Sequence, residues 1–212
     1  DEKNRTVTIA DNGIGMDRDD IINNIGTIAR SGTKEFLTKL SGDEAKDAHL
    51  IGQFGVGFYS SFIIADEVTL ISRKAGKKEG FKWQSKGDGE FTLESVVREE
   101  RGTTVILHLK KDEDEFLNSW RLKEIIKKYS DHITLPIVMK KTDFKDGNSV
   151  KTKEDEVIND ASAIWTRNKK DIKAKEYEEF YKSLTFDMEP PLAHFHTRVE
   201  GTQEYTSLLY IP

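Results

Sequence analysis

The sequence contains no cysteine, which excludes disulfides and any zinc or iron–sulfur site with cysteine ligands. It has only four prolines, and all of its apolar runs are shorter than a membrane-spanning helix. The N-terminus also lacks the basic and then apolar stretch of a secretory signal. These absences predict a cytoplasmic protein without a membrane partner.

Charge of one sign is not in large excess, because 33 Lys and Arg stand against 38 Asp and Glu, a formal net charge of −5. Non-specific nucleic-acid binding requires positive charge, so we expect no nucleic-acid partner. Apolar residues make up 36% of the 212-residue chain and charged residues 33%. The chain therefore has enough apolar material for a core, and room for one large domain or for one domain and part of another.

Apolar periodicity predicts an ordered series of strands and helices. A strand is expected at residues 6–9, followed by a helix that Asp17 can cap. A buried helix is expected at residues 56–65. Short alternating runs separated by polar, glycine-bearing turns predict an antiparallel meander at residues 67–73, 80–85, 91–97 and 103–110. An amphipathic helix at residues 122–133 and an edge strand at 135–139 follow.

The charged and small polar residues of the segment 141–160 predict a linker between two domains. The first domain would occupy residues 1–140, and residues 161–212 would begin a second one with a helix near 177–184 and a strand at 204–211. The chain starts without Met, inside a strand-like alternation. We therefore expect the first domain to lack its N-terminal elements.

A first glycine-bearing cluster, DNGIGM at residues 11–16, ends the first predicted strand. Gly13 and Gly15 have no Cβ, so the backbone can turn tightly and approach a flat ligand. The Asp11 carboxylate beside apolar residues requires a partner, and the exocyclic amine of an adenine would provide one. A solvated hairpin turn accounts for this cluster about equally well.

Two further clusters follow. Gly52, Gly55 and Gly57 precede a predicted helix whose free N–H groups could face phosphate oxygens, although no Lys-Ser/Thr pair follows as in a Walker motif. A closely packed loop is an equally good interpretation. Thr103, in the Gly-Thr pair of the third cluster, could reach a ligand or a bound water, but such pairs more often simply open a strand.

In this order, the patterns Asp-x-Gly-x-Gly, Gly-x-x-Gly-x-Gly and Gly-Thr resemble the split ATP-binding (GHKL) superfamily of gyrase B, histidine kinases, MutL and the ninety-kilodalton heat-shock chaperones. Residues 24–33 and 51–60 are similar to the chaperones specifically. Residues 165–168 and 199–205 resemble the opening of the chaperones' middle domain. The resemblance covers essentially the whole chain, and the short linker favours the bacterial branch.

This resemblance implies an α/β fold: an α+β two-layer sandwich of Bergerat type with a mostly antiparallel sheet, followed by the start of an α/β middle domain. It also implies that ATP or ADP binds under a mobile lid formed by residues 26–57. The function implied is that of an ATP-dependent molecular chaperone of the heat-shock response, in which nucleotide binding drives clamp closure on unfolded or partly folded client proteins.

The roles implied for individual residues follow the family's motifs. Asp11 would take the adenine amino group, with Thr103 supporting it through water. Met16 and Ile14 would pack near the base, and Gly13 and Gly15 would let the backbone approach it. Asn24 would contact the ribose or α-phosphate, and Arg30 would offer a cation. Without the resemblance, these two residues read as a helix-surface amide and a solvated charge. The phosphates would be held by backbone N–H groups of Gly52, Gln53, Phe54, Gly55, Val56, Gly57 and Phe58.

In this family the water-activating Glu and the Mg-coordinating Asn lie upstream of the first cluster, and a phosphate-sensing Arg lies further along the middle domain. The resemblance therefore implies that Mg belongs to the parent protein, a homodimeric ATPase. We expect this segment to contain no catalytic or metal-ligating residue and not to hydrolyse ATP by itself.

Two other functions remain open from the sequence. The same fold could serve as a nucleotide- or protein-binding module without turnover. Phosphoryl transfer to His or DNA repair is the least favoured, because no phospho-acceptor context surrounds the histidines and the net charge is negative.

Overall fold

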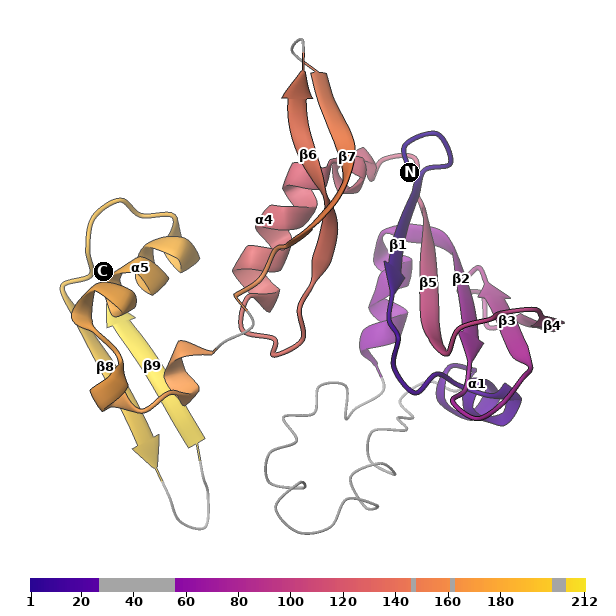
Figure 1. Cartoon of the computed structure of the whole chain (residues 1–212), viewed down its shortest axis with the longest axis horizontal. Helices are drawn as coiled ribbons and strands as arrows, with labels where there is room; N and C mark the ends of the chain where they lie inside the picture. Colours follow the sequence, from indigo (N-terminus) through magenta and orange to yellow (C-terminus); the bar gives the residue numbers. More distant parts are fainter. Residues whose placement is uncertain (27–55, 146–147, 161–162, 200–204) are drawn as a thin grey trace. The chain divides into compact units, whose positions relative to one another are not determined.

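The computed structural model describes residues 1–26, 56–145, 148–160, 163–199 and 205–212. They form two compact units, Asp1–Leu117 and Asn118–Pro212, whose elements are labelled in Figure 1. Within this described part, no helix combines the length and the apolar character that crossing a lipid bilayer requires.

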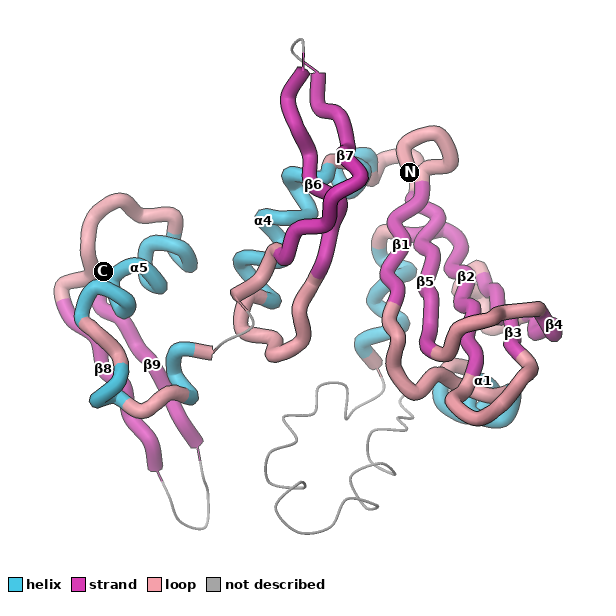
Figure 2. Tube along the Cα trace, viewed as in Figure 1, coloured by secondary structure: helices cyan, strands magenta, loops and turns pink. Residues whose placement is uncertain are grey.

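The first unit is built on a five-stranded antiparallel sheet with the order β1-β5-β2-β3-β4, whose strands are the magenta tubes with these labels in Figure 2. Its strands are β1 Thr6–Ala10, β2 Ala65–Arg73, β3 Gly80–Ser85, β4 Thr92–Val96 and β5 Gly102–Leu109. The sheet confirms the mostly antiparallel fold class. The predicted meander is confirmed for β2 to β4. β5 does not follow β4 at the edge but lies between β1 and β2 and pairs antiparallel with both, with apolar residues opposite one another, such as Val105 opposite Ile9 and Leu70.

The core of the first unit lies on one face of this sheet. Val68 pairs with Leu107, and since side chains alternate along a strand, Leu70 lies on the same face two residues further on. Helix α1 (Arg18–Asn24) contributes the fully buried Ile21 to the same cluster. Asp17 caps α1 as predicted, because its side chain accepts a hydrogen bond from the Asp20 backbone N–H at 3.1 Å.

The buried helix predicted at residues 56–65 is instead a short 3₁₀ helix, η1 (Gly57–Ile63), in which no residue is fully buried. The hydroxyls of Ser60 and Ser61 donate to carbonyls three residues earlier, and such local bonds compete with an α-helical ladder. Ala65, expected at the end of this helix, already belongs to β2. The prediction located the apolar segment correctly but assigned the wrong helix type.

The second unit combines two helices with two antiparallel hairpins, β6–β7 and β8–β9. The elements are α4 Ser119–Ser130, β6 Val138–Lys145, β7 Asn148–Val157, α5 Ala174–Thr185, β8 Ala193–Val199 and β9 Tyr205–Ile211, with short 3₁₀ turns at Ile164–Thr166 and Lys169–Asp171. Helix α4 begins earlier than predicted because the Asn118 side chain accepts from the Trp120 N–H at 2.8 Å. The predicted helix and strand near the C-terminus are confirmed as α5 and β9.

The segment predicted as a charged linker, residues 141–160, takes part in the β6–β7 hairpin. Its charges alternate across the strands, as in the ion pairs Lys140–Asp155 at 2.6 Å and Lys141–Glu154 at 3.6 Å. Such exposed ion pairs add little stability. However, opposite charges on facing residues avoid the repulsion by which like charges would destabilise the two-stranded ladder. The predicted edge strand at 135–139 accordingly begins at Val138. The division into domains at residues 140 and 160 remains a prediction.

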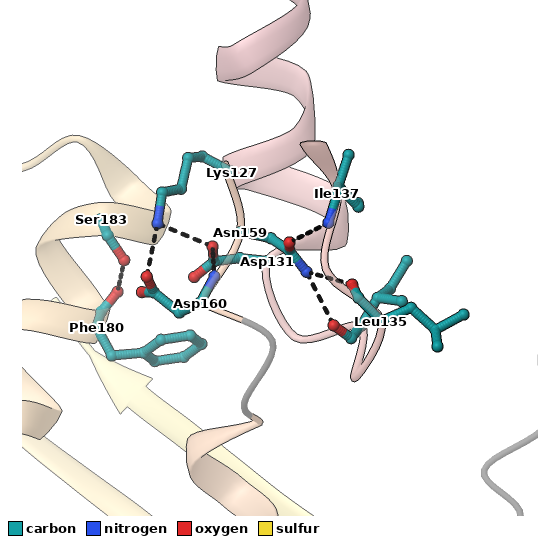
Figure 3. Close-up of polar contacts among 9 residues, drawn as sticks. Lys127, Asp131, Leu135, Ile137, Asn159, Asp160, Phe180 and Ser183 are labelled. Atoms are coloured by element: carbon teal, nitrogen blue, oxygen red, sulfur yellow. Dashed lines mark hydrogen bonds and ion pairs between the residues drawn. The ribbon is translucent and has the colours of Figure 1, made fainter. Parts of the chain in front are cut away.

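Asn159 joins the end of this hairpin to the loop between α4 and β6, as shown in Figure 3. Its Nδ2 donates to the carbonyls of Ile133 and Leu135 at 2.9 and 3.0 Å, and its Oδ1 accepts from the Ile137 N–H at 2.7 Å. The residue is 4% exposed. One buried amide therefore satisfies three backbone groups of a loop that lacks regular pairing of its own.

Replacing Asn159 with Ala should lower the free energy of unfolding of the second unit by about 2 kcal/mol, because three backbone groups lose their partner. The neighbouring Asp160→Ala should change it by less than about 0.5 kcal/mol, since that side chain is 71% exposed in its ion pair with Lys127. Urea denaturation of both variants measures the difference. Equal losses would show that the Asn159 amide does not hold the loop.

Candidate functional site

The first and third glycine-bearing clusters meet at one edge of the first unit, where β1 ends and β5 begins. The Asp11 N–H donates to the Thr103 carbonyl at 2.8 Å, and the Thr103 N–H donates to Asp11 Oδ1 at 3.2 Å. The same Oδ1 accepts from the Gly13 N–H at 2.8 Å. In the described part of the chain, both bonds to this exposed carboxylate go to Oδ1, so Oδ2 is left for another donor.

Two glycines allow the backbones at this edge to touch. Gly15 has a φ of +67°, and a Cβ there would lie 2.0 Å from the Arg73 carbonyl oxygen. Gly102 has a φ of +111°, and its Cβ would lie 2.1 Å from the Asp11 carbonyl oxygen. We expected Gly15 to make room for a ligand, but the space beside it is filled by the protein's own backbone at the end of β2. Both positions therefore require glycine for packing.

Ser72 was not predicted from the sequence, yet it lies between these segments. The residue is fully buried. Its Oγ accepts from the Met16 N–H at 2.8 Å and lies 3.1 Å from the Gly102 carbonyl and 2.9 Å from the Thr103 hydroxyl. One signal in the sequence could have identified it. Ser72 stands two residues after Leu70, so it lies on the face of β2 whose other residues are apolar. A polar residue at such a position requires hydrogen-bond partners.

Lys74, also missed, ties the start of α1 to the end of β2. Its Nζ lies 2.9 Å from Asp17 Oδ2 and 2.7 Å from Asp20 Oδ2. Burial alone would raise the pKa of Asp17, but the hydrogen bonds from Lys74 and the Asp20 backbone lower it below its ordinary value. The bonds to Asp20 and Asp17 raise the pKa of Lys74 in turn. The charged forms of both groups are thus favoured.

The remaining predicted residues are placed less closely. Met16 packs against the core, and Asn24 is the last residue of α1. Val56 is exposed just before η1, which Gly57 begins. Phe58 contacts Trp83 edge to face, with ring centroids 5.5 Å apart, so its side chain packs against the hydrophobic core. Arg30, Gly52, Gln53, Phe54 and Gly55 lie outside the described residues.

Tyr59 connects η1 to the end of α1. Its hydroxyl donates to the carbonyl of Ile25, directly after the helix that carries Asn24. Burial raises the pKa of the Tyr59 hydroxyl, which keeps it in the protonated, donating form. The beginning of η1 and the end of α1 are therefore held together, and these are the two described ends of the segment predicted as a lid.

Family models match both parts of the chain. The model described as histidine kinase-, DNA gyrase B- and HSP90-like ATPase matches residues 1–91, and the model described as Hsp90 protein matches residues 140–212.

Curated relatives match the full length of this chain. Chaperone protein HtpG of Dechloromonas aromatica (strain RCB) is 62% identical over 214 residues, which cover 100% of this chain and 34% of the relative. The proteins of the same name from Chromobacterium violaceum and Bordetella pertussis are 61% and 56% identical, again with 100% and 34% covered. The chain thus spans about a third of the length of the curated relatives it matches.

Gly15→Ala should lower the free energy of unfolding of the first unit by more than about 2 kcal/mol, because the added Cβ is both strained and in collision with the Arg73 carbonyl. Gly76 is the matched control, since its φ is +77° but nothing lies within 4 Å of a Cβ there. We expect Gly76→Ala to cost about 1 kcal/mol from strain alone. Denaturant titration of the two variants separates collision from strain, and equal effects would contradict the close approach.

Lys74→Met should raise the pKa of Asp17 towards its ordinary value of 3.8, which carboxyl NMR titration measures. Because the Asp17 pKa is lowered on folding, its contribution to stability is present above 3.8 and is lost as the pH falls through the lowered value. The Lys74 contribution is present below 10.5 and is lost as the pH rises through the raised value.

The stability difference between the wild type and Lys74→Met should therefore be largest between these limits, at about 1 kcal/mol, and shrink in acid and in strong base. Lys77→Met serves as the control, since Lys77 forms no ion pair within the described residues. A pH-independent difference would refute the electrostatic account.

Proposed function

Because the chain belongs to the Hsp90 family of ninety-kilodalton heat-shock chaperones, with HtpG among its similar members, we propose that it is the ATP-binding segment of an ATP-dependent molecular chaperone. The proposal rests on one observation in the site: among the described residues, Asp11 Oδ2 accepts no hydrogen bond, while Oδ1 of the same exposed carboxylate is held by two backbone N–H groups at the end of the sheet.

The residues at this edge fit an adenine nucleotide. Asp11 Oδ1 is held by the N–H groups of Gly13 and Thr103, so the carboxylate orientation is fixed before any ligand arrives. Oδ2 can then accept from an exocyclic amine, which a 6-aminopurine provides. Ile14, which is 64% exposed, and the half-buried Met16 offer apolar surface for a flat base. Preorganised acceptors of this kind reduce the cost of binding.

We further propose the remaining nucleotide contacts from the family's motifs. Asn24 would reach the ribose or α-phosphate and Arg30 the phosphates, with Mg bound in the longer parent protein. The backbone N–H groups of residues 52–58 would hold the phosphates beneath a lid at residues 26–57. The bond from Tyr59 to the Ile25 carbonyl supports this proposal, because it keeps the two ends of that segment together.

For the parent protein we propose a cytoplasmic, homodimeric clamp that acts on unfolded or partly folded client proteins, without nucleic-acid or membrane partners. Residues 1–140 would form its ATP-binding domain and residues 161–212 the beginning of its middle domain. The match of the Hsp90 protein model to residues 140–212 supports this division.

Calorimetric titration with ADP tests the adenine contact. Asp11→Asn should weaken ADP binding about 100-fold, because the amide keeps the Oδ1 acceptor for Gly13 and Thr103 but replaces the Oδ2 acceptor with a donor. The fold should be unchanged, since the described bonds of Asp11 are preserved.

Asp88→Asn is the matched control. Asp88 is an exposed turn residue whose Oδ1 likewise accepts from a backbone N–H two residues ahead, that of Glu90 at 3.2 Å. Its replacement should leave ADP binding unchanged. Full-strength binding by Asp11→Asn would remove the assignment of Asp11, and absence of binding by the folded wild type would refute nucleotide binding by this segment.

A further inference from the structure

The three methionines of the chain lie in very different surroundings, and they carry all of its sulfur because the sequence has no cysteine. Met16 is half-buried and packs against the core of the first unit. Met139 is half-buried in β6, where it lies opposite Glu156 of β7. Met188, by contrast, is 84% exposed. A dissolved oxidant therefore reaches the thioether of Met188 far more easily than the other two.

Met188 stands in the connection between α5 and β8, residues 186–192, whose flanking elements are labelled in Figure 1. Backbone hydrogen bonds hold this connection on both sides of Met188. The Phe186 N–H donates to the Lys182 carbonyl at 2.9 Å and closes the end of α5. The Glu189 N–H donates to Asp187 Oδ1 at 3.0 Å. Neither bond involves the Met188 side chain, so a chemical change at its sulfur leaves both in place.

The same connection exposes other apolar side chains. Phe186 and Leu192 are both exposed, as Met188 is. A methionine sulfoxide is polar, so its formation at Met188 would remove apolar surface from this connection without placing a polar group in the interior. At Met16 the same reaction would place a polar group against the core, which costs stability. The chain thus exposes the methionine whose oxidation the fold tolerates and shields the one whose oxidation it would not.

We propose that Met188 is a reversible oxidation site, at which peroxide makes the connection between α5 and β8 less apolar while the chain stays folded. The sulfur lone pair attacks one oxygen of hydrogen peroxide, so that an S–O bond forms as the O–O bond breaks. The sulfur is oxidised by two electrons, and the departing hydroxide takes up a proton to give water. A methionine sulfoxide reductase reverses the change with a dithiol as reductant. The proposal is independent of nucleotide binding.

The test exposes the whole chain to hydrogen peroxide and follows the added oxygen at each methionine by peptide mass spectrometry. Met188 should be oxidised about tenfold faster than Met16 or Met139, because the rate follows the exposure of the thioether. Chain oxidised at Met188 alone should elute earlier from a hydrophobic-interaction column than untreated chain. Its urea midpoint should be unchanged, and treatment with a methionine sulfoxide reductase should restore the original elution.

Two variants isolate the effect of the Met188 sulfur. Met188→Leu keeps an apolar side chain without a thioether, so peroxide should leave its elution unchanged. Met188→Gln introduces a polar side chain, and without any treatment it should elute early, like the oxidised wild type. Oxidation of Met16 or Met139 as fast as Met188 would overturn the proposal. So would an elution shift in Met188→Leu as large as that of the wild type, or a lower urea midpoint in chain oxidised at Met188 alone.

Discussion

The pairing of β5 with two partners is the constraint on which the first unit depends. β5 lies between β1 and β2, so one strand aligns residues from three distant parts of the chain. The pairing places Ser72 opposite Thr103 in the ladder, and it places the start of β5 against the end of β1. The contacts that Thr103 makes with Asp11 and with Ser72 follow from this alignment.

Sequence reasoning recovered the strands of this unit, because period-two alternation and glycine-bearing turns are local signals. It also singled out Asp11 and Thr103, which the structure brings together at one edge of the sheet. It did not recover the position of β5, since strand order depends on long-range register that one sequence does not reveal. Ser72 was missed for the same reason: its partners are Gly102 and Met16, which become neighbours only through that register. The close approach of the Arg73 carbonyl to Gly15 could not be foreseen either, because it too depends on how β2 lies beside the first glycine-bearing cluster.

The second unit shows where composition misleads. The charged segment at residues 141–160 has few apolar residues, and such composition is typical of linkers. It nevertheless pairs as a hairpin, with lysines facing carboxylates across the strands. The anchor of this hairpin is Asn159, a residue type common in loops, whose amide bonds to three backbone groups could not be read from the sequence. Register and tertiary hydrogen bonds, again non-local, decide the outcome.

The hydrogen bond from the Thr103 N–H to the Asp11 carboxylate spans 92 positions in the sequence, which has a consequence for biosynthesis. A ribosome extends the chain at about 5–20 residues per second, so the start of β1 emerges several seconds before its partner. Closing this long loop costs conformational entropy, which the contacts of β5 offset only once it has inserted between β1 and β2. Until then, the edge proposed to hold the base does not exist. A nucleotide that binds there, as proposed, could therefore stabilise the finished sheet but could not guide its early assembly, and the nascent β1 stays without its β5 partner in the meantime.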